Sequence, residues 1–163
     1  MPITIARAEA LERIKKERGE AACLMCAICD RAAGPVHAIF EDDAHLVILP
    51  RYVRRWGQVM VIPKLHTTTF AEVDEAAWST LNALVLGAAR AAEKVMQPRR
   101  CYLASTGSSA GELVQSSMHL HVHVIPLHEP DDKPADIFSW TNGVLVAEES
   151  EWKDLLRRYQ AVW

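Results

Sequence analysis

The sequence predicts a single domain that contains both β-strands and α-helices, for three reasons. Short runs rich in apolar and β-branched residues, bounded by turn-forming residues, predict several β-strands. Residues 74–96 instead repeat apolar residues at the spacing of an α-helix. The 163 residues, half of them hydrophobic and 24% charged, can bury one substantial core.

Composition argues against several classes of protein. The formal net charge is −3, so the sequence predicts no strongly basic surface that would bind nucleic acid. No apolar run is long enough for a membrane span, and the N-terminus lacks the apolar core of a signal peptide. Three of the four cysteines lie between Cys23 and Cys29, unlike the framework of a secreted, disulfide-rich protein. We therefore expect a cytoplasmic protein with no nucleic-acid and no membrane partner.

The first part of the chain predicts one helix and three strands. Residues 7–18 have the composition of a short polar helix that ends near Gly19. Residues 36–41 and 45–50 predict two strands joined by a tight acidic turn, and residues 58–63 predict the next strand. Nothing in the helix at 7–18 points to a function.

The rest of the chain adds a long helix, further strands and a last helix. Residues 74–96 form the long helix, with Asp74 as its N-cap, and would cover one face of a sheet. Residues 101–105 and 143–147 predict strands. Ser150 is expected to cap an amphipathic helix near the C-terminus.

Three histidines alternate with apolar residues within 118–126: His119, His121 and His123. As a strand, this stretch would place the three imidazoles on one face and the apolar side chains on the other. Pro126 is expected to end the strand, because proline cannot donate to a central ladder. Burying three titratable rings on one face carries a desolvation penalty unless each ring finds a partner, so the row requires a functional reason.

The residues alone leave two chemical roles open for this row. Neighbouring imidazoles could hold a catalytic metal ion. Alternatively, one imidazole could be a nucleophile while the others position the substrate.

The chain resembles the histidine triad (HIT) superfamily of nucleotide hydrolases and transferases. Residues 119–125 match its signature, His-φ-His-φ-His-φ-φ with φ apolar, at every position. Gln115 stands where the family carries a glutamine, and residues 40–43 and 61–66 resemble the family's E-D strand and V-I-P-K-x-H strand end. The resemblance covers about residues 23–127.

This resemblance implies a HIT-like fold of the α+β class in a homodimer. We expect an antiparallel sheet of roughly five strands with the long helix packed on it. Residues 1–163 would form a single HIT-like domain with its core at about 23–127, extra N-terminal and C-terminal helices, and a C-terminal extension from about 128 to 163.

The cysteines at 23–29 predict a structural zinc ion. Thiolates three residues apart can share a tetrahedral ion, but two more ligands must come from elsewhere. In zinc-bearing HIT proteins these are histidines at the P-K-x-H position and at the first triad position, which implies the ligands Cys23, Cys26, His66 and His119. Cys26 with Cys29 is the alternative pair, and idle cytosolic thiols are the alternative to any metal.

The resemblance also assigns catalytic roles to the triplet, with no organic cofactor. His121 would attack the α-phosphorus of a nucleotide conjugate, and water or another acceptor would resolve the nucleotidyl-histidine. His123 would donate to the phosphate oxygens or serve the leaving group. His119 would fix the strand through the zinc ion.

Five further residues are candidates for substrate binding. Asp42 would take the ribose hydroxyls, although a merely solvated acidic turn is the alternative. Gln58 stands where many members carry a histidine close to the phosphate. Gln115, Ser116 and Ser108, the last in a small polar loop, would contact the phosphate.

We therefore expect a nucleotide hydrolase or transferase that acts on a nucleoside phosphoramidate or a similar conjugate. A dinucleoside polyphosphate hydrolase or phosphorylase is the nearest alternative. A metal-dependent hydrolase that uses the triplet as ligands, and a nucleotide-binding module without turnover, are two more distant ones.

Overall fold

An antiparallel sheet of five strands organises the molecule. The computed structural model describes residues 1–107, 114 and 116–163. The strand order is β2-β3-β4-β6-β5, and all neighbours are antiparallel. The bounds are β2 His37–Glu41, β3 His45–Leu49, β4 Val59–Pro63, β5 Arg100–Ala104 and β6 Val122–Leu127. The predicted α+β class and five-stranded sheet are confirmed.

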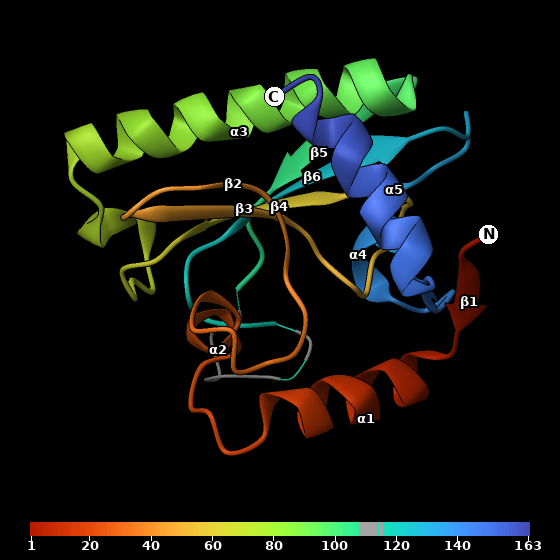
Figure 1. The fold of residues 1–163 in the computed structure, drawn as a ribbon, viewed down its shortest axis with the longest axis horizontal. Coiled ribbons are helices and arrows are strands. Elements are labelled where there is room, and N and C mark those ends of the chain that lie inside the picture. Colours follow the sequence, from red (N-terminus) through yellow and green to blue (C-terminus); the bar gives the residue numbers. More distant parts are fainter. Residues whose placement is uncertain (108–113, 115) are drawn as a thin grey trace.

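The long helix α3 (Glu75–Met96) covers one face of this sheet (Figure 1). The Asp74 carboxylate caps it by accepting a hydrogen bond from the Ala77 N–H at 2.8 Å. The helix contacts β4, β5 and β6, and helix α5 (Glu149–Gln160) packs beside it against β2. The buried side of α3, including Leu81 and Val85, joins the apolar residues of the sheet in one core.

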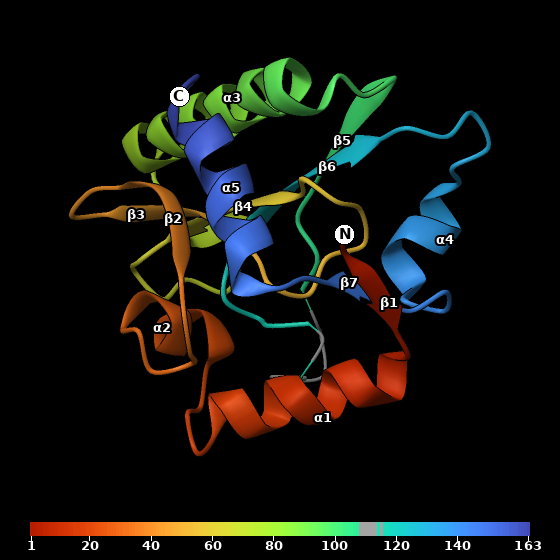
Figure 2. The same ribbon diagram turned by 45° about the vertical axis from the view of Figure 1, so that its right-hand side comes forward.

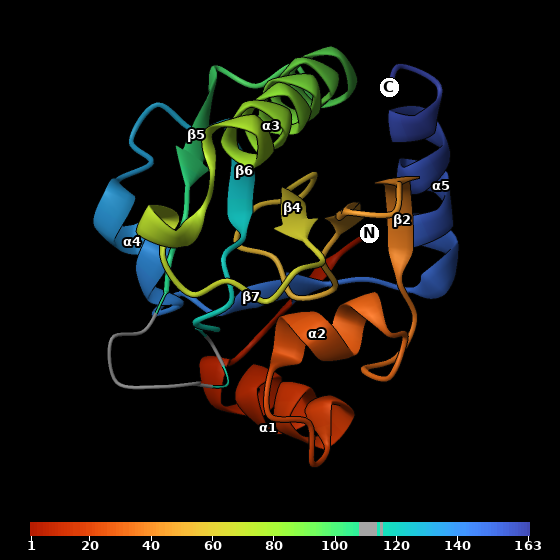
Figure 3. The same ribbon diagram turned by 90° about the vertical axis from the view of Figure 1, so that its left-hand side faces the viewer.

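The opposite face of the sheet carries helix α2 (Leu24–Cys29), with helix α1 (Arg7–Arg18) further out (Figure 3). The two faces follow from the alternation of side chains along a strand. In β4, Val59 and Val61 face the core under α3, whereas Met60 and Ile62 pack with residues of α2. Both faces of the central strands are therefore buried.

A second, two-stranded sheet joins the ends of the chain (Figure 2). Strand β1 (Ile3–Ile5) runs antiparallel to β7 (Val144–Val146). The short helices η1 (Phe70–Glu72) and α4 (Pro134–Ser139) complete the described elements. None of the described helices combines the length and apolar character needed to cross a membrane.

Two predictions about the histidine stretch are wrong. The strand begins at Val122, so His119 and His121 precede it instead of lying within it. Pro126 does not end the strand but pairs with Cys101 of β5. It is tolerated because β6 pairs with β4 over residues 122–124 alone, so β5 is the neighbour at this position.

The predicted cap of the last helix is also wrong. Helix α5 begins at Glu149, and Glu148 rather than Ser150 is its N-cap. The Glu148 side chain accepts from the backbone of Glu151, and the Glu151 side chain accepts from the Glu148 N–H at 3.1 Å. This reciprocal pair satisfies two backbone donors, which one serine hydroxyl does not.

The Tyr159 hydroxyl ties α5 to the loop before β4. Tyr159 is fully buried and donates to the Gly57 carbonyl oxygen at 2.6 Å. Tyr159→Phe leaves that buried carbonyl without its partner, so we expect the free energy of unfolding to fall by about 1–2 kcal/mol in urea denaturation. Tyr102→Phe is the control, because among the described residues Tyr102 makes ring contacts with Phe138 and Arg100 but its hydroxyl has no hydrogen-bond partner. Equal stability of the two variants would contradict the assigned role.

Candidate active site and metal centre

The three histidines lie close together, just before and at the start of β6, but they belong to two different sites. His119, His121 and His123 are all buried. The ring of His119 packs edge-on against His66, with 4.9 Å between the ring centroids. The rings of His121 and His123 pack against each other in the same way at 4.9 Å. Because the chain bends before β6 begins, the triplet divides into one histidine and a pair.

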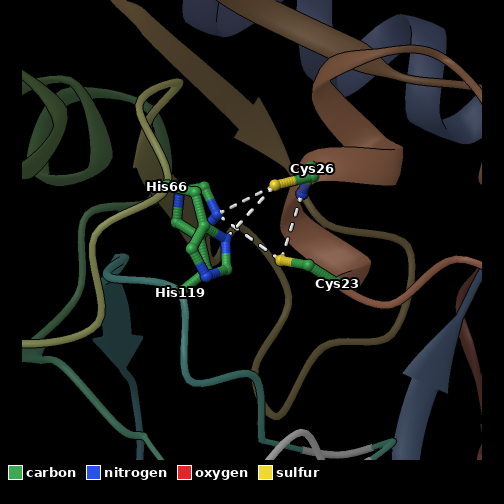
Figure 4. Close-up of side chains that lie close together, drawn as sticks. All are labelled: Cys23, Cys26, His66 and His119. Atoms are coloured by element: carbon green, nitrogen blue, oxygen red, sulfur yellow. Dashed lines mark hydrogen bonds between the residues drawn. The ribbon is translucent and has the colours of Figure 1, made fainter.

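The single histidine joins a cluster of two thiols and a second imidazole (Figure 4). The ligand atoms of Cys23, Cys26, His66 and His119 all lie within 4.8 Å of one another. His119 Nδ1 is 3.5 Å from Cys23 Sγ and 3.4 Å from Cys26 Sγ, and His66 Nδ1 is 3.4 Å from Cys26 Sγ. The structure thus brings together the four residues predicted as zinc ligands, and Cys29 is not in the group.

These distances and donor types fit a tetrahedral zinc ion. Zn–S bonds of about 2.3 Å and Zn–N bonds of about 2.0 Å would hold sulfur and nitrogen atoms roughly 3.5 Å apart. The Nε2–H of His119 donates to the Pro63 carbonyl oxygen at 2.7 Å, which turns Nδ1 toward the sulfur atoms. Helix α2 supplies both thiols, because Cys23 is its N-cap and Cys26 lies in its first turn.

Four protein ligands would close the coordination sphere, which is typical of a structural zinc rather than a catalytic one. His121 and His123 are outside the group that could hold the ion. This arrangement weighs against a catalytic metal held by the whole triplet.

The histidine pair lines a cavity between the sheet and helices α1 and α2. Its apolar wall includes Ile14 of α1, Met25 of α2 and Met60 of β4. Its polar lining comprises Glu17, Arg51, Tyr52, Arg54, Ser117, His121 and His123. An apolar cavity with a few converging polar groups is the usual form of a small-molecule site.

One hydrogen bond fixes the tautomer of the neutral His121 ring. Its Nδ1 lies 2.7 Å from the carbonyl oxygen of His119, which can only accept, so Nδ1 carries the hydrogen. In the neutral ring the lone pair is therefore on Nε2. Nε2 is therefore the atom of His121 that could act as a nucleophile.

A second contact fixes the protonation of His123. The Oε1 atom of Gln58 accepts from the Arg54 backbone N–H at 3.1 Å, so the amide nitrogen Nε2 faces His123 Nδ1 at 3.0 Å. The amide nitrogen donates, and the neutral His123 ring carries its hydrogen on Nε2. Burial, followed by the charges of His121 and Arg54, lowers the pKa of His123 well below its usual value.

The substrate-binding residues predicted from the sequence have different placements. Gln58 is buried and contacts His123. Ser116 is half-buried, next to Ser117 of the cavity, whereas Gln115 and Ser108 lie outside the described residues. The role predicted for each of these residues remains a prediction.

Asp42 occupies the turn between β2 and β3. Its Oδ1 accepts from the backbone N–H groups of Ala44 and His45, at 2.8 and 2.6 Å. Asp42 is not among the cavity-lining residues, and its carboxylate already satisfies the turn. A contact with ribose therefore has no support from the position of Asp42.

Sequence reasoning missed the charged residues between β3 and β4 and the contribution of α1. Glu17 of α1 accepts two hydrogen bonds from Arg51, at 2.8 and 3.1 Å, and one from the Tyr52 hydroxyl at 2.7 Å. The N-terminal helix is thereby fixed as a wall of the cavity. The sequence feature that could have indicated this charged wall is the cluster of three arginines at 51–55, shortly before Gln58.

Replacing one predicted zinc ligand tests the metal centre. We expect Cys26→Ser to lose stoichiometric zinc and to lower the melting temperature by roughly 5 °C or more, because metal binding contributes folding free energy. Cys29→Ser is the matched control and should keep its zinc. Metal analysis of the purified proteins and thermal melts measure both quantities. Full zinc content in Cys26→Ser, or its loss in Cys29→Ser, would show that the ligand set is wrong.

Replacing Gln58 tests the protonation assigned to His123. In Gln58→Glu, a carboxylate replaces the amide donor and accepts from Nδ1–H, which favours the charged imidazolium. We expect the pKa of His123 to rise relative to the unmodified protein, measured by NMR titration of labelled histidines. Gln160→Glu on the exposed side of α5 should leave that titration unchanged. An unaltered His123 titration in Gln58→Glu would exclude the assigned amide contact.

Comparison with known proteins agrees with this geometry. A family model described as the HIT domain matches residues 31–130. An uncharacterized HIT-like protein of Mycobacterium tuberculosis is 30% identical over 109 residues, which cover 67% of this chain and 74% of that protein. Adenylylsulfatase HINT3 of Arabidopsis thaliana is 30% identical over 110 residues, but the match covers only 54% of its length and 67% of this chain.

Solved structures give the same result. A zinc-bound histidine triad family protein from Mycobacterium smegmatis superimposes with a TM-score of 0.65 at 26% identity, over 88% of this chain and 96% of that one. A hypothetical histidine triad nucleotide-binding protein from Sulfolobus tokodaii shares the fold, with a TM-score of 0.69 at 24% identity, over 86% of this chain and 91% of that one. Because the family model matches more than half of the sequence, the chain belongs to the HIT domain family.

Proposed function

We propose that the chain is a nucleotide hydrolase or transferase that forms a covalent nucleotidyl-histidine on His121. The observation that carries this proposal is the 2.7 Å hydrogen bond from His121 Nδ1 to the His119 carbonyl oxygen, which leaves the lone pair on Nε2. His121 also lines the cavity, where a substrate could reach it. Membership of the HIT family and similarity to a named adenylylsulfatase support nucleotide chemistry.

The first step transfers the nucleotidyl group to the enzyme. The Nε2 lone pair of His121 forms a bond to the α-phosphorus, and the bond from phosphorus to the leaving group breaks with its electron pair. The ring keeps its hydrogen on Nδ1, and the His119 carbonyl stabilises the positive charge that develops there. Dividing one difficult substitution into two easier ones is the advantage of a covalent intermediate.

The second step releases the nucleotide. A water oxygen, or the oxygen of another acceptor, attacks phosphorus and loses its proton to solvent, while the P–N electron pair returns to Nε2. His123 Nε2–H donates to a phosphate oxygen throughout, with Gln58 holding its ring. We assign Gln115, Ser116 and Ser108 to the phosphate, and Asp42 remains the predicted ribose contact.

The metal centre has a structural role in this proposal. Zinc bound by Cys23, Cys26, His66 and His119 would supply a fixed anchor for the chain that bears the His119 carbonyl. The reaction itself uses the side chains of this chain and no organic cofactor.

The substrate would be a nucleoside phosphoramidate or a similar nucleotide conjugate, with a dinucleoside polyphosphate as the alternative. We further propose that residues 1–163 act as a single domain with its core at about 23–127, that the active form is a homodimer, and that it works in the cytoplasm. The free thiols of all four cysteines are compatible with a reducing compartment.

Replacing the nucleophile tests the proposed reaction. We expect His121→Ala to lose turnover of a nucleotide conjugate by at least about 10³-fold while still binding nucleotide, because the covalent step is lost. Mass spectrometry after brief exposure to substrate should detect a nucleotidyl adduct on His121 of the unmodified protein. His128→Ala, outside the cavity, is the control. Near-native turnover in His121→Ala would rule out the assigned nucleophile.

A further inference from the structure

Arg54 occupies an unusual position beside the histidine pair. It lies between β3 and β4 and lines the same cavity as His121 and His123. Its guanidinium carbon is 5.9 Å from the ring centroid of Phe138 and 5.8 Å from that of Trp140. These two rings, from α4 and its C-cap, hold the side chain in place by cation–π contact.

The neighbouring arginines have carboxylate partners, whereas Arg54 has none among the described residues. Arg51 pairs with Glu17, and Arg55 pairs with Asp132. The buried Nε of Arg54 lacks a hydrogen-bond partner within the described part of the chain. Burial lowers the pKa of Arg54 to about 10, so the group stays charged at neutral pH. A partly desolvated guanidinium without a counter-ion is a binding site for an anion.

His123 cannot provide the proton that some leaving groups require. The amide N–H of Gln58 points at its Nδ1, so an imidazolium would set two donors against each other. Among the described residues, the ring of His121 packs edge-on against His123 and Gln58 donates to it, and the positive charge of Arg54 also disfavours the imidazolium. An amine must be protonated as it leaves phosphorus. A sulfate, phosphate or carboxylate departs as a stable oxyanion without a proton.

Building on the function proposed above, we propose that Arg54 is the specificity-determining residue of the site: it binds, beside His123, the oxyanion that leaves a nucleotide anhydride. Arg54 thereby favours such anhydrides over the phosphoramidate among the conjugates considered above. His121 Nε2 bonds to the α-phosphorus, the P–O bond of the anhydride breaks, and its electron pair leaves on the oxygen of the departing anion. Arg54 stabilises that developing charge, and no proton transfer to the leaving group is needed. Arg54 thus determines which conjugates react.

The C-terminal extension supports this arrangement. Phe138 and Trp140 hold the guanidinium of Arg54, and Asp132 pairs with the adjacent Arg55. The extension therefore fixes the segment at 54–55 from two points. This gives residues 132–140 a role in substrate choice, although they contribute no nucleophile.

The test compares leaving groups on one nucleotide. We would measure kcat/KM of the zinc-loaded full chain for adenosine 5′-phosphosulfate, ADP and adenosine 5′-phosphoramidate. We expect at least one of the two anhydrides to exceed the phosphoramidate by about tenfold or more. Arg54→Gln should lower that ratio by at least about tenfold, because the departing anion loses its charged partner. Arg90→Gln, an exposed arginine on α3, is the matched control and should leave the ratio unchanged.

A second variant separates charge from packing, since Arg54 also contacts two aromatic rings. Arg54→Lys keeps the charge and should retain more of the ratio than Arg54→Gln, with melting temperatures to verify folding. Equal loss in the two variants, or a preference of the unmodified protein for the phosphoramidate, would overturn the inference. In that case a His121 adduct with any substrate would leave the proposed function standing. The absence of an adduct with all three would reject the proposed function, and the inference with it.

Discussion

The hydrogen bond from His121 Nδ1 to the His119 carbonyl oxygen is the contact on which the rest of the site depends. It joins two features that serve different purposes, because the ring of the same His119 faces the thiols while its backbone faces the neighbouring imidazole. Pro63 orients that ring from the other side. Any displacement of His119 would therefore alter the metal centre and the protonation of the nucleophile together.

The position of His123 is set by the sheet rather than by the metal centre. Strands β4 and β6 pair Met60 with His123, and Gln58, just before β4, reaches the same ring. Helix α5 holds the preceding loop through Tyr159 and Gly57. The core under α3 and α5 thus supports His123, and α2 supports His119 through the thiols.

Local patterns were sufficient to predict α1, α3 and most strands, because helical spacing, the Asp74 cap and alternating apolar runs are encoded within each segment. They were insufficient for α2, a six-residue apolar segment too short to show periodicity, and for β1, whose pairing with β7 joins opposite ends of the chain. The signature identified the three histidines but not their division. That division depends on partners from other parts of the chain. The ring of His119 contacts a thiol of α2 and the Pro63 carbonyl oxygen, whereas His121 and His123 contact each other.

The arginines at 51–55 show why the charge of a residue does not predict its role. Arg51, Arg54 and Arg55 lie within five residues of sequence, and nothing in that segment distinguishes them. Their partners in the fold distinguish them. Arg51 pairs with Glu17 of α1 and Arg55 pairs with Asp132. Arg54 contacts the rings of Phe138 and Trp140. The first and last arginines are neutralised by carboxylates and hold the fold together. Arg54 is held by the aromatic rings of Phe138 and Trp140, which fix a cation without neutralising its charge. Its positive charge therefore acts on a ligand bound in the cavity.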